Sequence, residues 1–227
     1  MSYKSIPYSN KILLLFILLL ALGCGSNEDM VDNTNGDNQT LSKNNVLLII
    51  ADDLGLDSTV GYNIGNQKPS MPTIQKLINA GIKFNNVWSN PVCTPTRGTI
   101  LTGKYGYRTS VLKVDDVLST SEISIFKNLK NNTNYNSAFI GKWHLSGKPS
   151  DRNHPNNMGI DYYAGILGGG VSDYFNWTLS KNGQNSNVNQ YITSVFTDEA
   201  INWINSQTSS WFLCLSYNAP HTPFHLA

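Results

Sequence analysis

The stretch VLLIIADD, residues 46–53, places an unbroken run of apolar side chains directly before two adjacent carboxylates. A short, continuous apolar run is typical of a central β-strand that is covered on both faces. Two later runs, residues 137–140 and 211–215, have the same character. The three runs therefore predict strands of one buried sheet.

Segments with apolar residues at helical spacing lie between these runs, at residues 73–80, 123–129 and 196–204. Strands that alternate with helices predict an α/β domain, with a largely parallel central sheet flanked by helices. Residues 147–190 are rich in Gly, Asn, Ser and Tyr, and we expect them to form a long excursion over the edge of the sheet.

Polar clusters follow each predicted strand. They are Asp52-Asp53, then GKWH at residues 141–144, then NAPHTPF at residues 218–224. In open α/β sheets, ligands bind outside the carboxyl ends of the strands. We therefore expect the three clusters to meet in one crevice.

The N-terminal residues have the pattern of an export signal. Lys4 and Lys11 precede an apolar run too short to span a bilayer comfortably, which ends in ALGC at residues 21–24. This ending resembles a bacterial lipobox, although an ordinary signal peptide with an incidental cysteine is the alternative. We expect a signal peptide at residues 1–23, a lipid on Cys24 that tethers the protein to a membrane, and a location in the bacterial cell envelope, periplasmic or at the cell surface. Residues 24–43 are polar and predict a flexible tether before a folded domain at residues 44–227.

The bulk composition excludes some classes of partner. The net charge is +1 and charged residues make up 14% of the chain, so no basic face is expected and a nucleic-acid partner is not predicted.

Of the three cysteines, Cys214 lies in an apolar run and predicts a small buried side chain, whereas Cys93 lies in a polar, Pro-flanked loop. An unpaired loop cysteine in an exported protein calls for a chemical reason.

Two of the polar segments suggest chemistry. Asp52 and Asp53 repel each other unless a cation joins them, and Ca²⁺ or Mg²⁺ prefers carboxylate oxygens, although Asp is also common in turns. In CTPTRGTILTG, residues 93–103, Pro95 suits the first turn of a helix whose N-terminus favours a bound anion, and Arg97 suits a tetrahedral oxyanion. A thiolate stabilised by Arg97 and a purely structural Cys93 remain alternatives.

Residues 93–103 resemble the signature of the sulfatase family, Cys-x-Pro-x-Arg followed by Leu-Thr-Gly. Four further segments resemble that family in the family's order: residues 46–53, 71–84, 141–145 and 219–224. Five motifs in order are more specific than any one of them. The resemblance covers residues 44–227 and indicates a formylglycine-dependent, arylsulfatase-like member of the alkaline-phosphatase superfamily.

The resemblance implies roles for the residues of the first two motifs. Asp52, Asp53 and residue 93 would bind Ca²⁺, with Mg²⁺ possible. A separate maturation enzyme would convert Cys93 to formylglycine, whose hydrate supplies the nucleophilic hydroxyl and is stabilised by Arg97.

The later motifs carry the implied contacts to substrate, a sulfated carbohydrate or an aryl sulfate. Lys142 would contact the sulfate ester, His144 would deprotonate the second hydroxyl of the hydrate, and His221 would protonate the leaving alcohol. His154 and His225 match no motif and are expected at the surface, and Ser172-Asp173 aligns only weakly with a sulfate-contacting Ser of the family.

The chain also departs from the family pattern. The family has an Asp-Asn metal pair and a sulfate-contacting Lys downstream of the Pro-His loop, whereas this sequence ends at Ala227, so the expected fold lacks its C-terminal part. Alternatives to sulfate ester hydrolysis are therefore a truncated, inactive lipoprotein or glycan binder, and a related phosphatase or phosphodiesterase.

Overall fold

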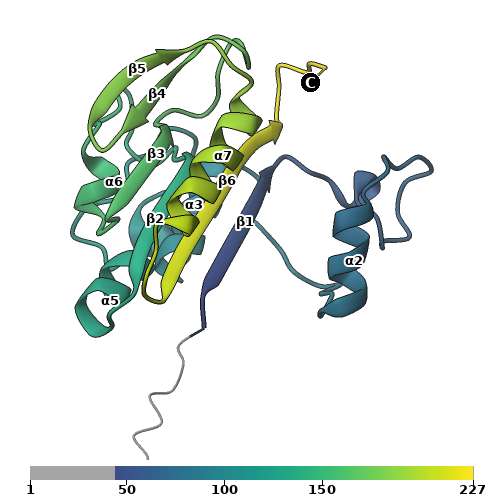
Figure 1. The fold of residues 1–227 in the computed structure, drawn as a ribbon, viewed down its shortest axis with the longest axis horizontal. Helices are drawn as coiled ribbons and strands as arrows, with labels where there is room; N and C mark the ends of the chain where they lie inside the picture. Colours follow the sequence, from purple (N-terminus) through teal and green to yellow (C-terminus); the bar gives the residue numbers. More distant parts are fainter. Residues whose placement is uncertain (1–43, 227) are drawn as a thin grey trace, which may run out of the picture. The chain divides into compact units, whose positions relative to one another are not determined.

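The computed structural model describes residues 44–226, so the predicted signal peptide, Cys24 and the tether lie outside the described residues (Figure 1). Every helix in residues 44–226 is too short or too polar to cross a membrane. In chain order the elements are β1 (Val46–Asp52), the 3-10 helix η1 (Leu56–Ser58), α2 (Pro72–Ala80), α3 (Cys93–Thr102), α4 (Gly106–Thr109), α5 (Ile125–Asn132), β2 (Asn136–Lys142), α6 (His154–Asn157), β3 (Tyr162–Ile166), β4 (Trp177–Lys181), β5 (Gln184–Val188), α7 (Ile192–Asn205) and β6 (Trp211–Pro220).

The strands form one six-stranded sheet in the order β1-β6-β2-β3-β4-β5. The pairs β1–β6, β6–β2 and β2–β3 are parallel, and β3–β4 and β4–β5 are antiparallel. The three predicted apolar runs are β1, β2 and β6, and β2 is buried along almost its whole length. The prediction that the first run is a central, covered strand was wrong, because β1 lies at the edge of the described sheet with Val46, Leu47 and Ile49 exposed. The predicted α/β class with a largely parallel central sheet is confirmed.

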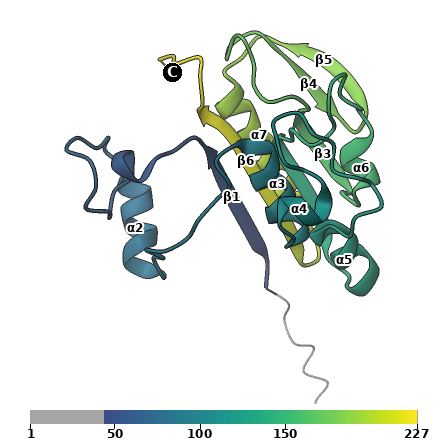
Figure 2. The ribbon, with the colours of Figure 1, turned by 180° about the vertical axis from the view of Figure 1, so that it is seen from behind.

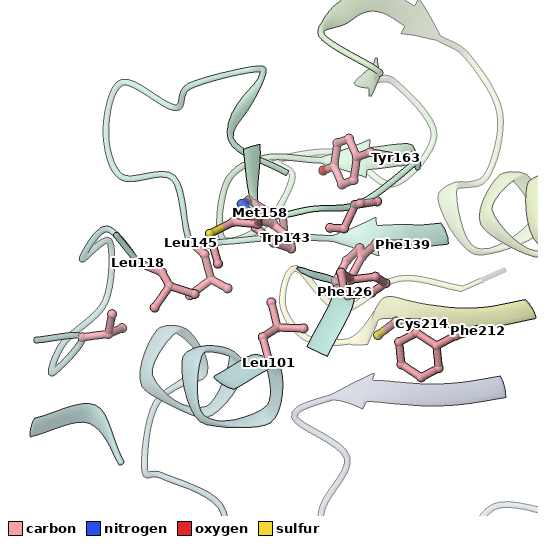
Figure 3. Close-up of a cluster of buried hydrophobic side chains, with 12 residues drawn as sticks. Leu101, Leu118, Phe126, Phe139, Trp143, Leu145, Met158, Tyr163, Phe212 and Cys214 are labelled. Atoms are coloured by element: carbon pink, nitrogen blue, oxygen red, sulfur yellow. The ribbon is translucent and has the colours of Figure 1, made fainter. Parts of the chain in front are cut away.

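Helices cover both faces of the sheet. On the face that Figure 1 presents, α7 packs Phe196 and Ala200 against inward-facing residues of β6 and β2. On the opposite face, seen in Figure 2, α3 and α5 contribute Leu101 and Phe126. Figure 3 shows this second cluster, in which Phe126 packs among aromatic side chains of the sheet. The two cores hold the strands, and therefore the strand ends, in fixed positions.

The expectation of a long excursion at residues 147–190 was wrong. This region contains α6 and three strands, of which β3 pairs in parallel with β2 and continues the sheet. The strands β4 and β5 form a hairpin around Asn182-Gly183, where both residues have positive φ (44° and 82°). An Asn-Gly pair at such a turn is a strong hairpin signal, because both central residues of a type I′ turn need positive φ.

The parallel strands end at one edge of the sheet. Ile50 of β1 and Gly141 of β2 both pair with Ser216 of β6, so the residues just beyond these positions share that edge. A Cβ on Gly141 would lie 1.8 Å from the carbonyl oxygen of Ser216, and the φ of Gly141 is 115°, so only glycine fits here. The polar clusters after the three strands therefore converge as the sequence predicts.

Candidate active site

Helix α3 brings Cys93 to the carboxyl edge of the sheet. Val92 is its N-cap, Cys93 is its first residue, and Pro95 lies in the first turn as predicted. The helix ends at Gly103, which is left-handed and donates its N–H to the carbonyl oxygen of Thr99 at 2.8 Å. This geometry leaves the Cys93 side chain partly exposed while Arg97, one turn on, is buried.

Arg97 ties α3 to two strands. Its Nη1 donates to the carbonyl oxygen of Lys142 and, at 2.8 Å, to Oγ of Ser216, and its Nη2 lies 3.2 Å from Oδ1 of Asp52. The Nε of Arg97 is buried and has no partner within residues 44–226. The contacts of Nη1 and Nη2 hold the guanidinium rigidly beneath the site, and only 4% of the side chain is exposed.

Asp52 lies between two buried cations. Its Oδ1 pairs with Arg97, and its Oδ2 accepts from the ammonium of Lys142, whose side chain is completely buried. Two positive charges thus share one buried carboxylate at this edge of the sheet. The surplus positive charge suits an anionic ligand, because isolated charges in a low-dielectric surrounding are strongly unfavourable.

Asp53 differs from its neighbour in surroundings and in backbone. Its side chain is 64% exposed and its φ is 62°, in the left-handed region that residues other than glycine seldom adopt. Oδ2 of Asp53 lies 3.8 Å from Nε2 of His221, and Nδ1 of His221 donates to the carbonyl oxygen of Thr222 at 2.7 Å. His221 is therefore brought to the Asp pair with its Nε2 turned toward the carboxylate.

His144 contacts Cys93 directly. Its Nδ1 lies 3.1 Å from Sγ of Cys93, and its Nε2 lies 2.9 Å from Oδ1 of Asp115. The hydrogen bond to His144 is the main cause that lowers the pKa of Cys93; burial opposes this effect and the positive charge of Lys142 adds to it. Cys93 and His144 thus form a hydrogen-bonded pair suited to proton transfer.

Three consecutive glycines, residues 168–170, form a loop that lies against the imidazole of His144. A Cβ on Gly169 would lie 2.5 Å from Cε1 and 2.7 Å from Nε2 of that ring, whereas a Cβ on Gly168 would meet nothing within 4 Å. The neighbouring Gly170 approaches His221, because its Cβ would lie 3.6 Å from Cε1 of that ring. The loop therefore passes both predicted histidines.

Four of the predicted site residues line one cavity of about 340 Å³: Asp52, Asp53, Cys93 and Arg97. A volume of this order suits a small ligand. Lys142 and His144 join this set through Asp52 and Cys93, and His221 joins it through Asp53. All the sequence-predicted residues thus belong to one site.

The donors at this site fit part of a shell for a hard divalent cation. Two carboxylates at the end of one strand face the same cavity as residue 93, and oxygen donors are the ligands that Ca²⁺ and Mg²⁺ prefer. Within residues 44–226 there is no group of three or more His, Cys, Asp or Glu side chains with the arrangement of a metal site. Ca²⁺ takes about six to eight oxygen ligands, so further donors are needed beside these.

Two histidine predictions were wrong. His154 is buried: its Nδ1 accepts from Nε1 of Trp143 at 3.1 Å and its Nε2 donates to the carbonyl oxygen of Leu118 at 2.8 Å. His225 is half-buried, with its ring stacked on Tyr174 at 3.7 Å between centroids. Both positions depend on aromatic partners distant in the sequence, which no local pattern reveals.

Sequence reasoning also missed two residues of the site. Asp115 contacts His144, and Ser216 accepts from Arg97. Ser216 could have been found from the register of β6, whereas Asp115 lies in a loop between helices and belongs to no motif.

A family model described as Sulfatase matches residues 44–227. The chain belongs to the sulfatase family. It is 27% identical over 192 residues to the N-acetylglucosamine-6-O-sulfatase of Bacteroides thetaiotaomicron, covering 82% of this chain and 32% of that enzyme. It is 33% identical over 141 residues to human steryl-sulfatase, covering 55% and 24% of the two chains.

A solved structure agrees with this membership. The crystal structure of Ps i-CgsB in complex with k-i-k-neocarrahexaose superposes with a TM-score of 0.71 at 29% identity, covering 82% of this chain and 47% of that one. The chain thus spans less than half the length of each of these three relatives.

Proposed function

We propose that the protein hydrolyses sulfate esters at the site around Cys93. The observation that carries the proposal is the pair of buried cations, Arg97 and Lys142, which share the single carboxylate of Asp52 directly beside the Cys93–His144 pair. Membership of the sulfatase family supports the same reaction.

The charge at this site suits the reaction. A sulfate ester is a tetrahedral anion, and negative charge builds on its oxygens as a nucleophile attacks the sulfur. Arg97 and Lys142 supply positive charge in a buried setting, where such groups act more strongly on developing charge than they do in water. Their rigid attachment to Asp52 means that little rearrangement is needed during the reaction.

We infer that Cys93 is used as formylglycine, made by a maturation enzyme, and that Asp52, Asp53 and residue 93 hold Ca²⁺, with Mg²⁺ as an alternative. The modified residue would supply a hydroxyl nucleophile, and the cation would supply further positive charge beside the sulfate. His144 would accept a proton from residue 93 through Nδ1, which already faces that side chain. Arg97 would orient residue 93 from one helical turn away.

His221 is the proposed general acid. Its Nδ1 proton is engaged by a backbone carbonyl, so Nε2 is the nitrogen that faces the site and could donate to the leaving alcohol. A leaving alkoxide is a poor leaving group, and a positioned acid contributes about 10²–10⁴-fold to such a step.

The proposed substrates are sulfated carbohydrates. Two relatives support this class: an N-acetylglucosamine-6-O-sulfatase, and a protein crystallised with k-i-k-neocarrahexaose. The test compares glucosamine 6-sulfate with glucosamine 6-phosphate, using full-length protein expressed beside a formylglycine-generating enzyme. Faster hydrolysis of the sulfate supports the proposal. Faster hydrolysis of the phosphate would favour a phosphatase, and binding of the sulfated sugar without hydrolysis would favour a glycan binder.

We also propose that a lipid on Cys24 anchors the protein in the bacterial cell envelope. Intact-mass measurement of the membrane fraction, beside a Cys24→Ala variant, tests this. Recovery of both forms in the soluble fraction would contradict the anchor.

A further inference from the structure

The loop that carries Asp115 is fastened to both halves of the Cys93–His144 pair. Val117 forms an isolated antiparallel bridge with Ser146, and the N–H of Leu118 donates to the carbonyl oxygen of Leu145 at 3.0 Å. The loop therefore runs along the segment that follows His144.

Asp115 itself has a tether on the other side. Its backbone N–H donates to Oγ1 of Thr94 at 3.2 Å, and Thr94 is fully buried and directly follows Cys93. The position of Asp115 is thus set by the helix that presents Cys93 as well as by the strand end that presents His144.

The carboxylate of Asp115 determines which ring nitrogen of His144 carries the proton. An ionised carboxylate only accepts hydrogen bonds, so Nε2 of His144, 2.9 Å from Oδ1, must be the protonated nitrogen. In the neutral ring Nδ1 is then unprotonated, and Nδ1 is the atom that lies 3.1 Å from the side chain of residue 93.

Both residues of this contact have an unfavourable backbone. The φ of Asp115 is 66° and that of His144 is 55°, and residues other than glycine adopt such angles only where the surroundings hold them. Strained residues of this kind gather at functional sites. Two of them joined by one hydrogen bond indicate that the contact itself is what the local structure maintains.

We propose that Asp115 is a positioning residue for His144, which keeps the proton on Nε2 so that Nδ1 can accept a proton from residue 93. When Nδ1 takes that proton the ring becomes an imidazolium, the Nε2 proton stays on the ring, and Asp115 stabilises the charge without becoming protonated itself. The tautomer is a property of the folded protein, whereas its catalytic consequence rests on the sulfate ester hydrolysis proposed above.

A surface ion pair is the competing explanation for Asp115. Nζ of Lys148 lies 2.7 Å from Oδ2 of Asp115, and the Lys148 side chain is 73% exposed. An exposed pair of this kind contributes little. Replacing Lys148 therefore separates the two explanations, because it removes the ion pair and leaves the contact to His144.

The test reads the tautomer directly. The protein has four histidines, so the ¹⁵N spectrum of the imidazole nitrogens is simple, and a His144→Gln variant assigns the signals of that ring. The spectra are taken on full-length Cys93→Ser protein, the reference for this test, at a pH where the His144 ring is neutral, because a serine hydroxyl keeps its proton whereas the thiol of Cys93, with its lowered pKa, could pass one to Nδ1 of His144. We expect a protonated Nε2 and an unprotonated Nδ1 in this reference and in Lys148→Met made on it.

Asp115→Asn should change the tautomer. The amide NH₂ can donate to Nε2, which favours a proton on Nδ1. Asp116→Asn is the matched control, because Asp116 shapes the same loop by accepting from the N–H groups of Leu112 and Lys113 at 2.8 and 2.9 Å. An Nδ1-protonated ring in the Cys93→Ser reference, an unchanged tautomer in Asp115→Asn made on it, or the same change in Asp116→Asn would each overturn the proposal.

Kinetics of the converted enzyme provide the second readout. We expect Asp115→Asn to lower kcat by about 10²-fold or more, as loss of a correctly protonated base does, with a change in KM of less than about threefold. Lys148→Met should leave kcat within about threefold of the wild type. Equal kcat values for Asp115→Asn and wild type would overturn the catalytic part of the proposal. A wild type that hydrolyses no sulfate ester, together with the expected tautomers in the Cys93→Ser proteins, would instead contradict the proposed function and support the positioning.

Discussion

Replacing Asp52 by Asn should destabilise the protein far more than the same change at Asp53. In Asp52→Asn the two buried cations, Arg97 and Lys142, lose the one carboxylate that pairs with them within residues 44–226, and the new NH₂ group can face the ammonium of Lys142, which has only donors. Removing one partner of a buried ion pair costs about 3–5 kcal/mol, because an uncompensated charge is left behind. Since whole domains are stable by about 5–15 kcal/mol, this loss is a large fraction of the total.

Asp53→Asn is the matched control. Its side chain is 64% exposed, and its contact with Nε2 of His221 is long, at 3.8 Å, so we expect a change within about 0.5 kcal/mol. The assay is urea unfolding of full-length protein in the presence of a chelator, so that bound metal does not contribute. Equal losses for the two variants would refute the account of Asp52 as the shared partner of the buried cations.

Three further predictions concern His144, His154 and Cys93. Gly169→Ala should lower kcat by about tenfold or more because its Cβ would collide with the ring of His144, whereas Gly168→Ala, whose Cβ meets nothing within 4 Å, should not; steady-state kinetics checks both, and equal effects would contradict it. Burial lowers the pKa of His154, so the unfolded state binds a proton at higher pH than the folded state does, and the free energy of unfolding falls as the pH drops below about 6.5. The urea midpoint, measured over a pH series, should therefore depend less on pH in His154→Gln than in the wild type. The same pH dependence in both proteins would be contrary to the prediction. The thiol of unconverted Cys93, whose pKa is lowered mainly by its hydrogen bond to His144, should react with iodoacetamide at neutral pH several-fold faster than in His144→Gln, and unchanged rates would count against that hydrogen bond.

The strands that position the site could be predicted because each is a continuous apolar run. The runs at β2 and β6 are buried, whereas β1 lies at the edge of the described sheet with Val46, Leu47 and Ile49 exposed; the polar residues after all three strands share one edge of the sheet. The strand β5, with sequence QNSNV, has no apolar pattern and is mostly exposed. It exists because the turn at Asn182-Gly183 folds it back on β4, and an Asn-Gly pair is the sequence signal for such a turn.

The ends of the strands could be placed from sequence, but the contacts between them could not. Asp52 and Asp53 read as equivalent carboxylates, yet one is buried between cations and the other is largely exposed, because the backbone turns to φ 62° at Asp53. Asp115 reaches His144 only because its loop is held by Thr94 and by the segment after His144. Contacts of this kind depend on tertiary packing and leave no periodic pattern in the chain.

The most direct test of the central claim is the release of inorganic sulfate from sulfated oligosaccharides, measured by ion chromatography with full-length protein expressed beside the maturation enzyme. The account predicts that the wild type releases sulfate, that Cys93→Ala releases none, and that the wild type releases less when a chelator is present. Release that is equal in wild type and Cys93→Ala, or no release together with confirmed formylglycine at position 93, would contradict it.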